Sequence, residues 1–127
     1  MALVREVMTV VPTAVSPNVT ARDAAKVLAE SDVGPLPVVD GELLVGIVTD
    51  RDLVVRVLAD DRDPAVTTVG EIASTEVITV EPDVELDVAL ELMSSRQVRR
   101  LPVVEEGRLV GILSAVDVEA AAPFGEA

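Results

Sequence analysis

The chain repeats itself at a constant offset of 65 positions. Three ordered blocks of the first half recur in the second half, and no gap is needed to align them. The blocks are residues 15–19, 36–39 and 44–47, which recur as residues 80–84, 101–104 and 109–112. One matching tetrapeptide of common apolar residues could arise by chance, but three blocks at one offset indicate a duplication. We therefore expect one unit built twice, with copies at residues 1–62 and 63–127.

Each copy has the pattern of a strand, a helix, two strands and a second helix, which predicts an α/β (α+β) fold class. Runs rich in β-branched residues, and continuous apolar runs typical of buried strands, mark the strands. The expected strands are residues 13–15, 36–39 and 43–48 in the first copy, and residues 77–80, 101–104 and 108–113 in the second. Polar turns at residues 40–42 and 105–107 join the last two strands of each copy into a hairpin.

Capping residues mark where the helices begin. Thr20 is placed to cap the first helix of the first copy, with Asp23 three residues later. Asp83 is the expected cap of the corresponding helix in the second copy. The second helix of each copy is expected to begin near Asp50 and Val116.

The residues between the copies predict a linker. Residues 60–64 are charged and end in proline, and Thr68 can cap a short helix that runs to Ser74. At 127 residues, the two copies together have the usual size of one compact module.

The composition excludes several classes of function. The net charge of −13 would repel a nucleic-acid backbone, and the absence of His and Cys removes the commonest general base and all thiolate chemistry. Phe124 is the sole aromatic residue, so bases cannot stack on aromatic side chains. The acids are spread along the chain, and no apolar run approaches about 20 residues. We expect a cytoplasmic protein that is not an enzyme and binds neither nucleic acid nor membrane.

The repeated blocks resemble the CBS domain. Each copy has Leu-Pro-Val-Val, a turn, Leu-Val-Gly-Ile, and then a Thr or Ser three residues before an Asp. The resemblance covers nearly the whole chain, from about Val4 to Ala121. Residues 50–54 and 97–101 are also similar to stand-alone two-CBS proteins of the hypoxic response type.

The resemblance implies a tandem CBS pair, or Bateman module, in which two β-α-β-β-α repeats pack with pseudo-twofold symmetry. Such modules often bind adenosine-containing ligands such as AMP, ADP, ATP or S-adenosylmethionine in clefts between the repeats, and they commonly form homodimers. The implied function is a non-catalytic regulatory module that requires no cofactor and signals to a partner protein of unknown identity. The alternative is a structural or scaffolding CBS dimer without ligand.

The family's first ligand motif begins with a glycine and ends with a Thr or Ser three residues before an Asp. It falls on Gly46, Thr49 and Asp52 in the first copy, and on Gly111, Ser114 and Asp117 in the second. A carboxylate can accept hydrogen bonds from both hydroxyls of a ribose, and a hydroxyl at a helix start can bond a phosphate oxygen. Arg51 adds a guanidinium beside the first site only. The same spacing is also an ordinary helix-capping arrangement, so a purely structural role is the alternative.

The family's second motif, Gly-x-x-Pro, is matched by the first copy from Gly34 and Pro35 onward, where a glycine lets backbone approach an adenine edge. The second copy departs from it and places Arg99 and Arg100 there. These arginines either bind phosphate, or complement a helix C-terminus and pair with surface acids. By the family pattern, the segments that line the adenine pocket include Thr13 and Ile78. We therefore expect two unequal sites.

Overall fold

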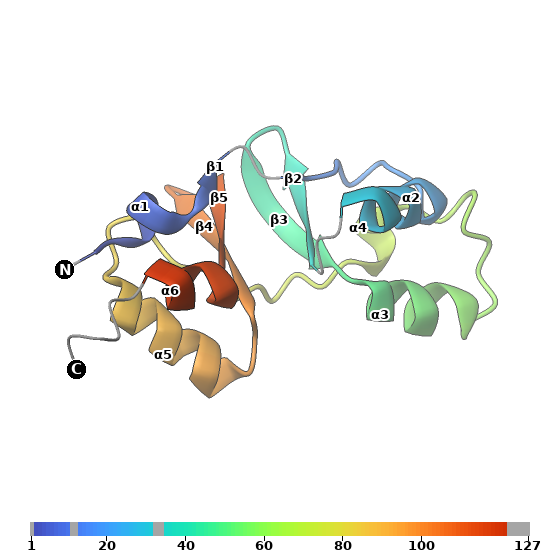
Figure 1. Cartoon of the computed structure of the whole chain (residues 1–127). Coiled ribbons are helices and arrows are strands. Elements are labelled where there is room, and N and C mark those ends of the chain that lie inside the picture. Colours follow the sequence, from blue (N-terminus) through green and yellow to red (C-terminus); the bar gives the residue numbers. More distant parts are fainter. Residues whose placement is uncertain (1, 11–12, 32–34, 122–127) are drawn as a thin grey trace. The chain divides into compact units, whose positions relative to one another are not determined.

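The chain folds into two compact units (Figure 1). The computed structural model describes residues 2–10, 13–31 and 35–121. The first unit consists of Thr13–Val77, and the second unit combines Met1–Pro12 with Ile78–Ala127. The N-terminal segment therefore belongs to the same unit as the second repeat.

A β-hairpin forms the centre of the first unit. Strands β2 (Leu36–Asp40) and β3 (Leu43–Val48) pair antiparallel, and Gly41 takes a positive φ of 67° in the turn that joins them. Helix α2 packs against α3, and α3 continues directly into a π-helical segment. The helices are α2 (Ala21–Ser31), α3 (Asp50–Leu53), the π-helical η1 (Val54–Leu58) and α4 (Val69–Ile72). The aliphatic core includes Leu36, Val38, Val48, Val57 and Ile72.

The second unit is built in the same way. Strands β4 (Arg100–Glu105) and β5 (Arg108–Ser114) form its hairpin, and the short strand β1 (Thr9–Val10) pairs antiparallel with β5. Helix α5 packs against α6. The helices are α1 (Val4–Val7), α5 (Leu86–Arg96) and α6 (Ala115–Ala121). The core includes Val4, Met93, Leu101, Val103 and Leu113. Within the described residues, no helix is both long and apolar enough to cross a bilayer.

Each unit contains a short helix that comes from the other repeat. Helices α1 and α4 lie 65 positions apart and make matching contacts. The Val4 N–H donates to the Val84 carbonyl at 2.8 Å, and the Val69 N–H donates to the Val19 carbonyl at 2.8 Å. Val4 and Val69 are both fully buried. Because a four-residue helix cannot bury its own apolar side chains, each short helix is held by the core on which it docks.

The compact units divide the chain differently from the sequence repeat. The boundary between residues 62 and 63 was expected from the sequence repeat, and it stays a prediction about the duplicated copies. Residues 60–64, interpreted as a linker, lie inside the first unit. There the Arg22 N–H donates to the Pro64 carbonyl at 3.1 Å, and Arg62 pairs with Glu71 at 2.7 Å.

The expected hairpins are confirmed, whereas the strands that precede each first helix are shorter than expected. Residues 13–15 and 77–80 each contribute a single parallel bridge, from Val15 to Val38 and from Val80 to Val103. A proline follows two residues after each bridge, and proline cannot donate a hydrogen bond to extend a ladder.

The capping predictions had different outcomes. The Asp23 N–H donates to Thr20 Oγ1 at 3.1 Å, so the predicted cap of α2 is confirmed. The predicted cap at Asp83 is wrong, because Glu85 precedes α5 and makes no side-chain capping bond. Asp83 instead forms an ion pair with Arg5 of α1. The hydrogen bond from Arg5 to Asp83, together with the carboxylate charge, raises the pKa of Arg5 above its ordinary value.

The short helix expected at residues 68–74 ends at Ile72. Ser74 is excluded from it because its backbone exchanges two hydrogen bonds of 2.9 Å with Ile47 of β3. The last residues of the expected helix therefore extend the edge of the hairpin instead.

Candidate ligand-binding sites

The strand register of the first unit brings its candidate residues to one end of the hairpin. Val15 bridges Val38 in parallel, which places Thr13, two residues earlier, beside the start of β2. Because β2 starts opposite the end of β3, Pro35 and Thr49 also lie at this end. Thr13 is exposed, whereas Pro35 and Thr49 are partly buried.

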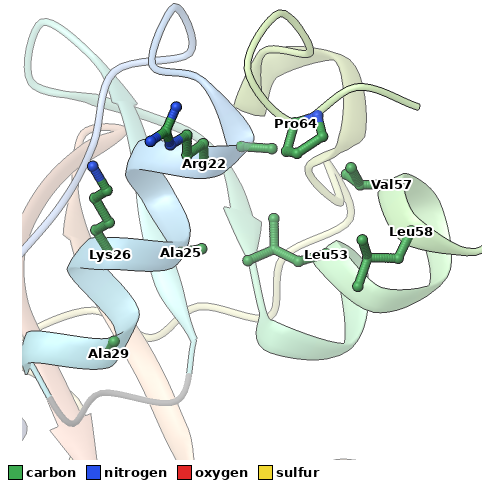
Figure 2. A pocket seen from close by; sticks show the side chains of 9 residues that line it. Arg22, Ala25, Lys26, Ala29, Leu53, Val57, Leu58 and Pro64 are labelled. Carbon is green, nitrogen blue, oxygen red and sulfur yellow. The ribbon is translucent and has the colours of Figure 1, made fainter. Parts of the chain in front are cut away.

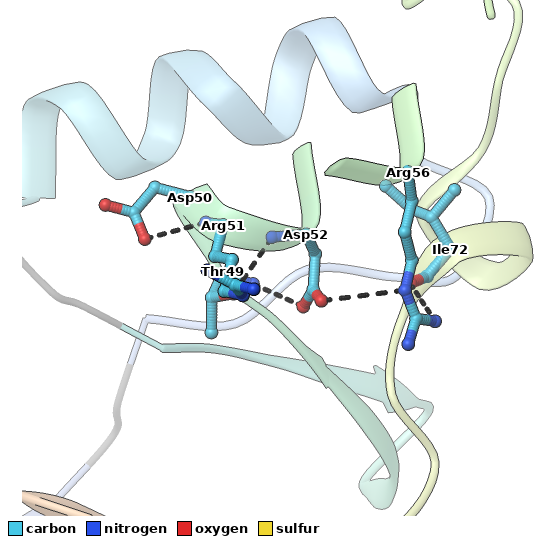
Figure 3. Close-up of polar contacts among 6 residues, drawn as sticks. All are labelled: Thr49, Asp50, Arg51, Asp52, Arg56 and Ile72. Atoms are coloured by element: carbon cyan, nitrogen blue, oxygen red, sulfur yellow. Dashed lines mark hydrogen bonds and ion pairs between the residues drawn. The ribbon is translucent and has the colours of Figure 1, made fainter. Parts of the chain in front are cut away.

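Thr49 and Asp52 form a reciprocal capping box at the start of α3 (Figure 3). The Asp52 N–H donates to Thr49 Oγ1 at 3.1 Å, and the Thr49 N–H donates to Asp52 Oδ2 at 2.9 Å. The Asp52 side chain is only 16% exposed. The helix-capping role that was the alternative to ligand binding is thus present in the first unit. It does not exclude a ligand role, because a carboxylate has about four lone-pair sites, of which the cap and one neighbour use only two.

That neighbour is Arg56, one helical turn after Asp52. Its Nε atom lies 3.8 Å from Asp52 Oδ1, and its Nη1 atom donates to the Ile72 carbonyl at 3.1 Å (Figure 3). Arg56 therefore links the candidate ribose-binding carboxylate to the last residue of α4. Sequence reasoning missed Arg56, although an arginine four residues after an acid on a helix is a recognisable signal.

Arg51 is the free cation of the first site. Its side chain is exposed and forms no ion pair with any residue that the structure describes. Its backbone N–H donates to Asp50 Oδ1 at 2.9 Å. Gly34, the other candidate of this site, lies outside the described residues.

The second unit assembles its candidates in the same arrangement. The parallel bridge at Val80 places Ile78 beside the start of β4, and Arg100 lies directly opposite Ser114 across the β4–β5 ladder. The Asp117 N–H donates to Ser114 Oγ at 3.1 Å. The return bond of a capping box is absent here, and the exposed Asp117 carboxylate accepts no hydrogen bond from a described residue.

The two arginines of the second unit stand beside this motif. The Ala115 N–H donates to the Arg99 carbonyl at 2.8 Å, which holds the start of α6 against the start of β4. Neither Arg99 nor Arg100 forms an ion pair with the part of the chain that the structure describes. A cavity of about 430 Å³ lies between α5 and α6, and its lining includes Arg99, Ala115 and Glu119.

The glycines that begin the first motif have a packing role. A Cβ at Gly46 would lie 2.9 Å from the Ser74 carbonyl oxygen, and one at Gly111 would lie 2.9 Å from the Thr9 carbonyl oxygen. Both contacts are with the segment that extends the hairpin edge. Glycine is therefore needed at both positions for close backbone approach, independently of any ligand.

The fold and the paired motifs define a tandem CBS module, and comparison with known proteins supports this. The CBS domain model matches residues 4–59 and again residues 69–122. The chain belongs to the CBS domain family, as the resemblance in its sequence implied.

Curated relatives are similar along nearly the whole chain. The CBS domain-containing protein YhcV of Bacillus subtilis is 41% identical over 118 residues, which are 93% of this chain and 84% of YhcV. Hypoxic response protein 1 of Mycobacterium tuberculosis is 38% identical over 119 residues, which are 93% of this chain and 83% of that protein. The expected similarity to the hypoxic response type is thus confirmed.

Solved structures share the fold. Hypoxic Response Protein I with two coordinated zinc ions has a TM-score of 0.87 at 36% identity, covering 96% of this chain and 100% of that one. CBSX2 in complex with AMP has a TM-score of 0.85 at 30% identity and covers both chains completely. The CBS domain pair of MJ0100, in complex with 5-methylthioadenosine and S-adenosyl-L-methionine, has a TM-score of 0.81 at 31% identity, covering 99% of this chain and 98% of that one.

Proposed function

We propose that this chain is a non-catalytic regulatory module that binds an adenosine-containing ligand in each unit and passes the change to a partner protein as a cytoplasmic homodimer. The observation that carries the proposal is the matched arrangement of the two units. In each, a hydroxyl and a carboxylate at the start of a helix lie beside the start of a buried strand and close to an arginine that forms no ion pair with the described residues. The complexes of CBSX2 with AMP and of MJ0100 with adenosyl ligands support the choice of ligand class.

The chemistry of the candidate residues fits ribose and phosphate. Asp52 and Asp117 can each accept hydrogen bonds from ribose hydroxyls, and such charge-assisted bonds are worth about 1.5–3 kcal/mol each where water is excluded. Thr49 and Ser114 supply hydroxyls at the helix starts. We assign adenine contacts to the strand-entry segments, which contain Thr13, Gly34 and Pro35 in the first unit and Ile78 in the second.

The two sites would differ in the position of the arginines that bind phosphate. Arg51 follows the hydroxyl in the first unit, whereas Arg99 and Arg100 precede the strand in the second. A guanidinium binds phosphate oxygens in a bidentate manner, so both units could hold a phosphorylated ligand, with the phosphate approached from different sides.

A thermal-shift panel with AMP, ADP, ATP and S-adenosylmethionine tests the proposal. A ligand present at 100 times its dissociation constant should stabilise the fold by about 2.7 kcal/mol. The double variant Asp52→Ala with Asp117→Ala is the matched control and should lose the shift. If the wild-type chain shows no shift with any of the four ligands at millimolar concentration, and no nucleotide is detected by mass spectrometry after denaturation of the purified protein, the proposal is wrong.

The reciprocal capping box favours a second candidate function, a scaffolding dimer without ligand. Thr49 and Asp52 already satisfy one another, so the motif has a complete structural role in the first unit. On this account Asp52→Ala lowers stability and has no effect on any ligand response. A nucleotide-induced shift that disappears in Asp52→Ala or Asp117→Ala would exclude it.

A further inference from the structure

Helix α3 and the π-helical segment that follows it place Arg56 between the first candidate site and helix α4. Leu53 and Val57 form the apolar stripe of this helix and line a cavity of about 420 Å³ beside α2 (Figure 2). Both pack in the core of the first unit. Asp52 and Arg56 each precede one of these residues by one position and form the adjacent polar stripe. Packing of the apolar stripe therefore fixes the helix and leaves Arg56 within reach of α4.

Arg56 uses different nitrogen atoms for its two contacts. Its Nε atom lies 3.8 Å from Asp52 Oδ1, and its Nη1 atom donates at 3.1 Å to the carbonyl of Ile72, the last residue of α4 (Figure 3). The last carbonyls of a helix have no partner within that helix, so the guanidinium satisfies one of them. Arg56 also lies in a π-helical segment, a rare conformation that is frequent at functional sites. One planar group thus contacts both the candidate carboxylate and the end of α4.

Helix α4 depends on docking for its structure. Four residues are too few for a stable isolated helix, so contacts outside the helix must hold it. A segment held by a few contacts can open locally while the rest of the unit stays folded. A stronger contact between Arg56 and Ile72 should therefore make α4 open less often. The backbone N–H groups that hold this segment are those of Val69, Gly70 and Ser74, which donate to the carbonyls of Val19, Pro17 and Ile47 at 2.8, 2.8 and 2.9 Å.

We propose that Arg56 is a positioning residue that couples occupancy of the first site to the docking of α4. This inference rests on the ligand function proposed above and specifies its regulation. A ribose bound at Asp52 excludes water from the carboxylate, and the attraction between Asp52 and Arg56 grows as the local dielectric constant falls. A guanidinium that is held more firmly also holds the Ile72 carbonyl more firmly. Because coupling is reciprocal, docked α4 raises the affinity for the ligand by the same factor.

The second unit provides an internal comparison. Position 121, which corresponds to Arg56, is an alanine, and Asp117 forms no ion pair with the described residues. The short helix α1, which docks on this unit, is held instead by the ion pair of Arg5 with Asp83, outside the candidate motif. The coupling is therefore confined to the first unit, and ligand in the second unit should not change the docking of α1.

Hydrogen exchange of the full chain with and without AMP tests the coupling. In the wild type, saturating AMP should slow the exchange of the Val69, Gly70 and Ser74 amides about fivefold, near the lower end of usual coupling strengths. Exchange of residues 4–7 in α1 should not respond. In Arg56→Met the slowing should disappear, and AMP should bind the first site about fivefold more weakly in calorimetry, as reciprocity requires.

Arg62→Met is the matched control, because Arg62 also holds α4 but does so through Glu71, at 2.7 Å, instead of through Asp52. Without ligand, it should speed the exchange of α4 as Arg56→Met does, yet it should keep the response to AMP. A response that persists in Arg56→Met, or that is lost equally in Arg62→Met, would overturn the coupling while leaving ligand binding intact.

The thermal-shift panel separates this inference from the ligand proposal. Absence of a shift with AMP in the wild-type chain would overturn the coupling. The ligand proposal itself is overturned only if ADP, ATP and S-adenosylmethionine give no shift either and no nucleotide is detected in the purified protein.

Discussion

The two units share a scaffold and differ in how their candidate ligand motifs are held. In the first unit the Asp52 carboxylate accepts a hydrogen bond from the Thr49 N–H and lies close to Arg56. In the second unit the Asp117 carboxylate accepts no hydrogen bond from a described residue. Position 121, which corresponds to Arg56, is an alanine. The two copies thus share the residues that build the fold but differ in the residues that orient the carboxylate. One repeated motif can therefore hold its carboxylate either in a reciprocal capping box or free of such a bond.

The largest expected effect on stability comes from the short helix that docks on each unit, α1 on the second and α4 on the first. Val4→Ala and Val69→Ala each remove two methyl groups from a fully buried position, so each should lower the free energy of unfolding by about 2–3 kcal/mol. Hydrogen exchange should locate the loss in the second unit for Val4→Ala and in the first unit for Val69→Ala, because each short helix docks outside its own repeat.

Val66→Ala is the control for this pair, because Val66 is 72% exposed and its truncation should change stability by less than about 0.5 kcal/mol. Loss of protection in the first unit on Val4→Ala would show that α1 packs with its own repeat, and would contradict the exchange of short helices.

A smaller effect on stability should distinguish the helix-start motif of the first unit from that of the second. Asp52→Ala leaves the partly buried Thr49 N–H without its acceptor, so it should cost about 1 kcal/mol in urea unfolding without ligand. Asp117→Ala removes no such bond and should cost only a few tenths of a kcal/mol. Equal losses in the two variants would mean that the capping boxes are equivalent in solution.

The smallest effect concerns Arg56, which is specific to the first unit. Arg56→Met should lower the free energy of unfolding by less than about 0.5 kcal/mol, because the arginine side chain is 50% exposed and its ion pair is long. Repeating the urea titration in 1 M NaCl should remove the part of the difference that comes from the ion pair, since salt screens this pair. A difference that is unchanged by salt would assign the effect to the hydrogen bond from Arg56 to the Ile72 carbonyl and to packing of the arginine stem instead.

Much of the fold could be predicted because its signals are local. The bounds of β3 agree with the expected strand at residues 43–48, and Thr20 caps α2 as expected, since alternation, turn residues and caps act within a few positions. The exchange of α1 and α4 could not be predicted in this way. Four residues are too few to show a helical period, and the contacts of Val4 and Val69 come from distant parts of the chain.

The candidate sites were predictable to a smaller extent. The motif spacing located Thr49, Asp52, Ser114 and Asp117, and the strand register brings the strand-entry residues beside them. The spacing could not show that only the first motif closes into a reciprocal box, because this depends on backbone geometry at the helix start. Asp83 shows the same limit, since α5 begins only at Leu86 and Asp83 lies two residues before its N-cap position.

Calorimetric titration of the wild-type chain with AMP tests whether the repeated candidate motif forms two unequal binding sites. We predict two binding steps of different affinity per chain, of which Asp52→Ala removes one and Asp117→Ala removes the other. Two steps of identical affinity, or binding that survives both substitutions together, would contradict this account.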